Sequence, residues 1–122
     1  MKFQPDRAEG VNLITRQEPG RLWVGAQALE GSVLIPWKGA PLPWPAAEGQ
    51  TMTTDHFDAV LALKPEVVIF GSGSRLRFAH ASAYRALIEA RIGLETMDTA
   101  AACRTYNVLA SEGRSVVAAL VV

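Results

Sequence analysis

The chain has little of what a disulfide-bonded or metal-binding protein needs. Its 122 residues include one cysteine, Cys103, and two histidines, His56 and His80. A single cysteine cannot form an intrachain disulfide, which is typical of proteins kept in a reducing compartment. One cysteine and two histidines at distant positions form no metal-ligand pattern. We therefore expect no metal site and no cofactor.

The sequence also lacks a charge excess and a long apolar run. Lys and Arg total 12, and Asp and Glu total 12, whereas nucleic-acid binders usually carry a basic excess. Only Arg75, Arg77, Arg85 and Arg91 lie close enough in sequence to form a local basic patch. The longest apolar run, 116–122, is too short to cross a bilayer, and the N-terminus has no signal-peptide core. We expect a cytoplasmic protein that neither inserts into membranes nor binds nucleic acid.

The order of the predicted elements indicates one α/β domain over residues 1–122, with residues 1–10 flexible. Short apolar segments separated by glycine turns predict an antiparallel meander in the first third of the chain. From Thr54 onward helices and strands alternate, which predicts parallel strands with right-handed crossovers. The meander either extends this sheet or packs beside it. The expected strands are 11–15, 22–24 with 27–29 as its continuation, 32–35, 66–70, 94–97 and 116–122, and the expected helices are 54–63, 82–93 and 98–112.

A proline-rich loop, residues 36–49, separates the two parts. It contains four of the seven prolines and two of the three tryptophans, Trp37 and Trp44. Proline stiffens such a loop without a hydrogen-bonded ladder. One interpretation is an exposed aromatic patch that binds a partner. The other is that both indoles fold back onto the core and anchor the loop.

The strand 66–70 runs directly into a small glycine turn. Gly71, Ser72, Gly73, Ser74 and Arg75 supply free N–H groups, two hydroxyls and a guanidinium. Ligands of open α/β sheets bind beyond the carboxyl ends of the strands, so this turn is a candidate site for an anion or small molecule. It lacks the third glycine of a dinucleotide fingerprint and the lysine of a P-loop. The alternative is a structural turn that needs small residues for packing.

A second polar cluster follows the strand 94–97. Asp98 and Thr99 lie at its carboxyl end, and Arg104 and Asn107 share one face of the next helix by their spacing. If the two strands are neighbours, this cluster and the glycine turn border one hollow. The alternative is that Asp98 caps the helix and pairs with Arg104. The opposite face of the helix, including Cys103, is apolar, which favours a buried thiol over a nucleophile.

Two segments, 65–73 and 93–114, resemble domain-of-unknown-function family 498, the Mth-938-like domain. The resemblance covers nearly the whole chain from Val11. It rests on the Gly-Ser-Gly turn after an apolar strand and on a second signature, present here as Met97, Asp98, Thr99, Ala102, Arg104, Thr105, Tyr106, Asn107, Leu109, Glu112, Gly113 and Arg114. The resemblance implies a three-layer α/β domain with a mixed central sheet. Mitochondrial members are similar to an assembly factor for respiratory complex I, bacterial members have no assigned activity, and the compact length indicates a bacterial member.

These observations lead to two functional hypotheses. The first is a non-enzymatic protein-interaction or assembly module, with an unknown protein or a second copy of the chain as partner. The resemblance, the lack of a complete catalytic set and the tryptophan-bearing loop favour it. The second is a binding protein or weak enzyme for an anion or small molecule, with its site at the turn Gly71–Arg75 and at Asp98 and Arg104.

Overall fold

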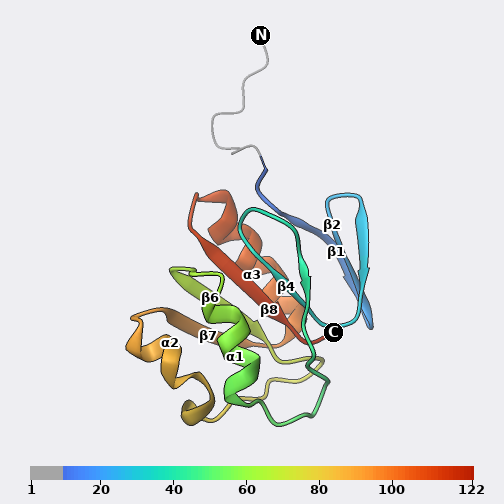
Figure 1. The fold of residues 1–122 in the computed structure, drawn as a ribbon. Helices are drawn as coiled ribbons and strands as arrows, with labels where there is room; N and C mark the ends of the chain where they lie inside the picture. The colour runs from blue at the N-terminus through green and yellow to red at the C-terminus, as the bar shows by residue number, and fades with distance from the viewer. Residues whose placement is uncertain (1–9) are drawn as a thin grey trace.

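The computed structural model describes residues 10–122, so the expected flexibility of the first ten residues falls almost wholly outside the described part of the chain. Two sheets and a set of helices make up the fold (Figure 1). The first sheet is antiparallel, in the order β1-β2-β3, and the second is mixed, in the order β5-β4-β8-β6-β7. The elements are β1 (Ile14–Glu18), β2 (Arg21–Val24), β3 (Gln27–Glu30), β4 (Val33–Ile35), β5 (Leu42–Pro43), α1 (Thr54–Leu61), β6 (Val67–Gly71), the 3₁₀ helix η1 (Ala81–Tyr84), α2 (Arg85–Glu89), β7 (Gly93–Met97), α3 (Thr99–Ser111) and β8 (Val116–Leu120).

The predicted fold class is confirmed, with three local corrections. The segment 27–29 does not continue β2, because a turn with Gly25 at φ +58° reverses the chain into the separate strand β3. Strand β4 leaves the meander and pairs with β8 of the main sheet. The predicted helix 82–93 is only the short α2 preceded by η1. A 3₁₀ turn has fewer residues per turn than an α-helix, which changes the phase and leaves Ile88 55% exposed while Leu87 is fully buried.

The main sheet is covered on both faces, and β6 shows how its sequence produces this. Val67 and Ile69 belong to the core beside α3, whereas Val68 and Phe70 belong to the core beside α1 and α2. Figure 1 shows α1 and α2 on one side of the sheet and α3 on the other, with β1 and β2 beside α3. A continuous apolar run is what a strand buried on both faces requires.

Helix α3 joins the two sheets. Its apolar stripe is confirmed, since Ala102, Cys103, Tyr106 and Ala110 are buried. The Tyr106 hydroxyl donates to the carbonyl oxygens of Asn12 at 2.9 Å and Pro36 at 3.0 Å. These bonds hold both ends of the meander segment against the helix. Within the described residues, no helix combines the length and the apolar character that crossing a membrane requires.

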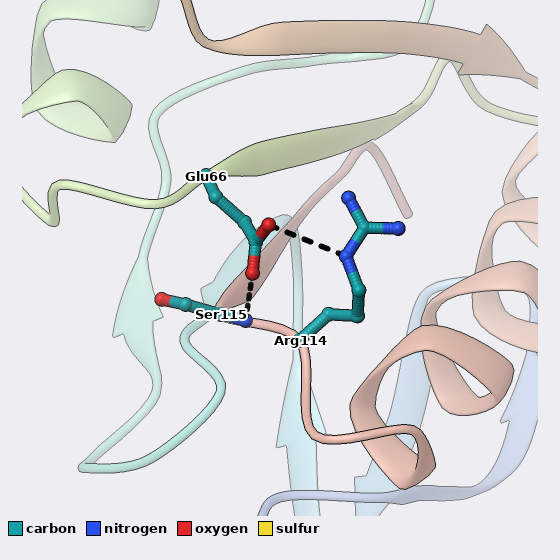
Figure 2. A network of polar contacts seen from close by, with 3 residues as sticks. All are labelled: Glu66, Arg114 and Ser115. Carbon is teal, nitrogen blue, oxygen red and sulfur yellow. Dashed lines mark hydrogen bonds and ion pairs between the residues drawn. The ribbon is translucent and has the colours of Figure 1, made fainter.

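A polar network aligns the beginnings of two parallel strands. The Glu66 carboxylate accepts hydrogen bonds from Arg114 Nε at 3.3 Å and from the Ser115 main-chain N–H at 3.0 Å (Figure 2). The Glu66 N–H in turn donates to the Ser115 carbonyl at 2.9 Å. Both charged side chains are about half exposed, so the ion pair itself contributes little, and the main-chain bonds set the register of β6 against β8.

Candidate functional site

The ends of β6 and β7 meet at one edge of the sheet, as the sequence predicted for neighbouring strands. The Ser72 N–H donates to the Met97 carbonyl, and the Thr99 N–H donates to the Gly73 carbonyl, both at 2.9 Å. The glycine turn therefore continues the ladder past the strands and joins directly to the beginning of α3. The glycine turn and the Asp98–Thr99 part of the second cluster border the same edge, while their proposed ligand-binding role stays a prediction.

Thr99 closes the centre of this edge. Its Oγ1 accepts a hydrogen bond from the Gly73 N–H at 2.9 Å and donates one to the Val121 carbonyl at 2.6 Å. The residue is only 3% exposed. The hydroxyl thus satisfies two buried main-chain groups, which would be costly to leave unpaired. Thr99 joins three segments of the fold and has little surface left for a ligand.

Gly71 permits the close packing beneath the turn. A Cβ at this position would lie 2.9 Å from Leu120 Cδ2, and 3.0 Å from both Ala102 Cβ and Thr99 Cα. Contacts this short do not occur between ordinary side chains, so only glycine lets α3 approach β6 here. This part of the signature serves packing, in agreement with the structural alternative that the sequence left open.

Ser72 shapes the loop that follows the turn. Its Oγ donates to the Arg75 carbonyl at 2.7 Å and accepts from the Arg77 N–H at 2.9 Å. The side chain is 4% exposed, so its hydroxyl is committed to these main-chain groups. A second, longer contact of 3.3 Å joins it to the Met97 carbonyl. One buried hydroxyl therefore holds residues 75–77 in a fixed path.

A carboxylate from the proline-rich loop binds the other face of the turn. Glu48 Oε2 accepts the Ser74 N–H at 3.0 Å and the Ser74 hydroxyl. These two hydrogen bonds lower the pKa of Glu48, and the nearby Arg77 and Arg75 lower it further. The role of Glu48 could not be predicted from the sequence, because 26 residues separate it from Ser74 and no local motif marks it.

The loop 74–80 exposes both charged and large apolar side chains. Phe78 is 75% exposed and Leu76 is 53% exposed, and Arg75 and Arg77 are exposed as well. Within residues 10–122, the ion pairs use other arginines, so neither Arg75 nor Arg77 is paired within 4 Å. Arg77 and Phe78 also border a hollow of about 180 Å³ whose lining includes Met52, Phe70 and His80. We call residues 75–78 the arginine loop.

The remaining predicted residues have separate structural places. Asp98 caps α3 by accepting the Ala101 N–H at 2.9 Å. Arg104 is exposed, and the described residues contain no ion pair between it and Asp98. The Asn107 amide accepts the Ile14 N–H at 2.8 Å and donates to the Ile14 carbonyl at 2.7 Å. Asn107 therefore attaches β1 to α3 and points away from the glycine turn.

Both tryptophans of the proline-rich loop fold back onto the protein. Trp44 is 3% exposed and donates from Nε1 to the His56 carbonyl at 3.0 Å. Trp37 is partly buried and donates to the Ala110 carbonyl at 3.0 Å. This arrangement corresponds to the anchoring interpretation, so these indoles do not form an exposed aromatic patch.

Two of the groups considered for catalysis or metal binding, Cys103 and His56, are buried. Burial raises the pKa of the Cys103 thiol to about 11, partly offset by Arg104, so the thiolate is disfavoured at neutral pH. His56 accepts the Thr53 N–H at Nδ1, which leaves Nε2 to donate to the Pro45 carbonyl at 2.9 Å. Thr53 is the N-cap of α1, which begins at Thr54 as the sequence predicted. Residues 10–122 hold no group of three side chains able to bind a metal ion.

Comparison with known proteins supports the assignment to a family. A crystal structure of an outer membrane protein from Bartonella henselae matches with a TM-score of 0.82 and 29% identity over 92% of this chain and 95% of that one. The solution structure of a Bordetella pertussis protein, described as a Mth938-like domain, matches with a TM-score of 0.79 and 27% identity over 99% of this chain and 92% of that one.

A curated human protein gives a further match along the sequence. The human NADH dehydrogenase [ubiquinone] 1 alpha subcomplex assembly factor 3 is 29% identical over 98% of this chain and 65% of its own length. The chain thus spans somewhat less than two thirds of that relative. The model of the family described as "Protein of unknown function (DUF498/DUF598)" matches residues 14–121. This chain, with its Mth938-like fold and its distant relation to the assembly factor, therefore belongs to the DUF498/DUF598 family.

Proposed function

We propose that this protein is a non-enzymatic interaction module of the assembly-factor type, and that the arginine loop is its contact surface. The observation that carries the proposal is the exposure of Leu76 and Phe78, at 53% and 75%, next to two arginines that have no ion-pair partner among the described residues. Aromatic residues and arginine are enriched where binding energy is concentrated in protein interfaces. The relation to an assembly factor supports the same class of function.

The arginine loop is arranged in advance of binding. Ser72 holds its main chain through the hydrogen bonds to Arg75 and Arg77, and Glu48 holds the preceding residue, Ser74. A loop that is already ordered loses less conformational entropy when a partner binds. The exposed side chains can therefore contribute most of their burial energy to association.

The charge of this surface favours a protein partner. Anionic membranes attract clusters of roughly 4–8 basic residues, and proteins that bind nucleic acids tightly make about 6–10 phosphate contacts. The arginine loop supplies two arginines, and the whole chain has no net charge. Two guanidinium groups next to two large apolar side chains match an interface that combines carboxylates with an apolar anchor.

The test is capture of the partner with matched surface variants. Replacing Leu76 and Phe78 by serine together removes the apolar part of the arginine loop. Replacing Ile88 and Val108 by serine together is the control, because it removes two apolar side chains, 55% and 57% exposed, from α2 and α3. After crosslinking in the native cell at the natural expression level, we expect the wild-type protein and the second variant to retain the same partner and the first variant to lose it.

Three outcomes contradict the proposal. One is the absence of any crosslinked partner of the wild-type protein, and another is loss of the partner in both variants. The third is retention of the partner by the Leu76/Phe78 variant. A homodimer would appear as a crosslinked species of twice the chain mass and would identify a second copy as the partner.

A further inference from the structure

The glycine turn binds an anion that belongs to the chain itself. Ser74 directs both its main-chain N–H and its hydroxyl toward one oxygen of Glu48, which comes from the distant proline-rich loop. Two donors converging on one carboxylate oxygen form a strong, charge-assisted arrangement. The sequence predicted an anion-binding turn at this place, and a side chain of the protein occupies it.

The shape of the turn fits this carboxylate closely. Gly73 has φ +109°, a conformation that side-chain-bearing residues rarely adopt. A Cβ at Gly73 would lie 2.9 Å from Glu48 Cδ and 3.1 Å from both Cγ and Oε2. The glycine therefore leaves room for the carboxylate group as well as allowing the turn. Any other residue at this position would push Glu48 away.

Charge near the turn favours an anion on this side of Ser74. Arg75 and Arg77 act on the Glu48 carboxylate and contribute to its lowered pKa, after the larger effect of the two hydrogen bonds from Ser74. Both arginines lack ion-pair partners within the described residues. If Glu48 moved away, this positive charge would lose its nearby counter-charge and attract another anion.

Glu48 can leave the turn without disturbing the core. Glu48 is exposed, and so are its neighbours Ala47 and Gly49. Gly49 has φ +81°, a conformation typical of a turn. The hydrogen bonds of the Glu48 side chain in the structure are those to Ser74. A hollow of about 270 Å³ adjoins the turn and is lined by Glu48, Gly73, Ser74, Asp98 and Ala100 among others. An incoming group thus has space to reach the donors that Glu48 uses.

We infer that the Gly73–Ser74 turn is a carboxylate-binding site which Glu48 fills in the free protein and from which an external carboxylate displaces it. A carboxylate is favoured over a phosphate because Asp98 lines the same hollow and would repel a doubly charged anion more strongly. The inference goes beyond the proposed function, since the arginine loop could bind a partner through Leu76 and Phe78 with Glu48 still in place. Glu48 then acts as an intramolecular competitor, and its high local concentration reduces the binding of weak external anions to the turn.

The experiment follows the Ser74 amide resonance of the full chain by two-dimensional NMR. Glu48→Ala removes the competitor, and Glu89→Ala removes an exposed carboxylate from α2 as a matched control. We expect the Ser74 amide to shift in the Glu48 variant only, and added acetate to return it saturably toward its wild-type position. Glu48 competes with acetate for the same donors, so the wild-type midpoint rises with the fraction of molecules in which Glu48 fills the turn. If this fraction is about nine tenths or more, the acetate midpoint should be at least about tenfold lower in Glu48→Ala than in the wild-type protein.

Two further arms make the result decisive. Inorganic phosphate, titrated at the same ionic strength, should restore the Ser74 resonance with a higher midpoint than acetate. Ser74→Ala in the Glu48→Ala background should raise the acetate midpoint of the neighbouring Gly73 and Arg75 amides, because it removes the hydroxyl donor and keeps the main-chain N–H. Should Glu48→Ala fail to give a folded spectrum, Glu48→Gln replaces it, because it removes the charge and keeps the side-chain size.

The inference is overturned if acetate leaves the Ser74 amide of the folded Glu48 variant unmoved. It is equally overturned if acetate moves this amide only in parallel with amides all over the surface. A lower midpoint for phosphate than for acetate would refute the assignment to carboxylates. None of these results bears on the crosslinking test, in which Glu48 is unchanged, so the two proposals fail separately.

Discussion

Replacing Thr99 by valine tests whether the junction between the glycine turn and α3 is held by one hydroxyl. Valine has nearly the shape of threonine but cannot form a hydrogen bond. In Thr99→Val the Gly73 N–H and the Val121 carbonyl, which bond to Thr99 Oγ1 at 2.9 and 2.6 Å, lose their shared partner. Each buried group left unpaired costs about 1–3 kcal/mol. The added methyl group returns up to about 0.8 kcal/mol.

We therefore expect Thr99→Val to lower the free energy of unfolding by about 1–5 kcal/mol, a large part of the roughly 5–15 kcal/mol that stabilises an ordinary domain. Thr99→Ser is the matched control, because it keeps the hydroxyl and loses one methyl group, at a cost of about 1 kcal/mol. Urea unfolding followed by tryptophan fluorescence gives both values. Trp44 is well placed to report it, since it is buried in the core that includes Val121.

The order of stability is the decisive result. Wild type should be the most stable, serine intermediate and valine the least stable. If valine were as stable as the wild type, or more stable than serine, the hydroxyl would not be satisfying two buried main-chain groups. The Thr99 hydroxyl would then be free of its two main-chain partners, and the residue would again be a candidate for ligand binding.

Three other changes test separate parts of the structure. Gly71→Ala places a Cβ 2.9 Å from Leu120 Cδ2 and should cost about 1–3 kcal/mol in urea unfolding, whereas an unchanged midpoint would show that the packing is looser. Asn107→Ala removes both hydrogen bonds to Ile14, and should speed amide exchange in β1 and β2 about tenfold or more while leaving β6 protected; uniform exchange would contradict this. Burial raises the Cys103 pKa from 9.0 to about 11, so the folded state keeps a proton that the unfolded state releases. The contribution of Cys103 to stability should therefore be constant below about pH 8 and fall by about 2–3 kcal/mol as the pH rises from about 9 to about 11. Cys103→Ala should reduce that fall, and an identical pH profile in the variant would refute the assignment.

Much of the fold could be predicted because its signals are local. The apolar run of β6 indicates a strand buried on both faces, and the apolar stripe of α3 indicates the side that packs on a sheet. Alternation of helices and strands after Thr54 predicts parallel strands, and the structure confirms the pairing of β6 with β7 and β8. Errors arose where a local pattern has two solutions. The segment 82–93 has helical spacing, but a 3₁₀ turn at its beginning changes which residues face the core.

The candidate site divides in the same way. The position of the glycine turn, and its meeting with the start of α3, followed from the sequence because the carboxyl ends of parallel strands lie at one edge of a sheet. What each side chain does there depends on residues far away in sequence. The Thr99 hydroxyl donates a hydrogen bond to the Val121 carbonyl, and the Ser74 N–H donates one to the Glu48 carboxylate. The Asn107 side chain accepts a hydrogen bond from the Ile14 N–H.

The sequence by itself thus determined the family, the α/β class and the edge of the sheet where a site would lie, since strand and helix patterns repeat over a few residues. Only the tertiary structure decided that the hydroxyl of Thr99 bonds to main-chain groups of the protein itself, that a carboxylate of the proline-rich loop occupies the turn, and that Leu76 and Phe78 are both exposed on the arginine loop. These outcomes come from long-range contacts, such as the 26-residue separation of Glu48 and Ser74. No periodic pattern records such contacts, because they depend on how whole segments pack against one another.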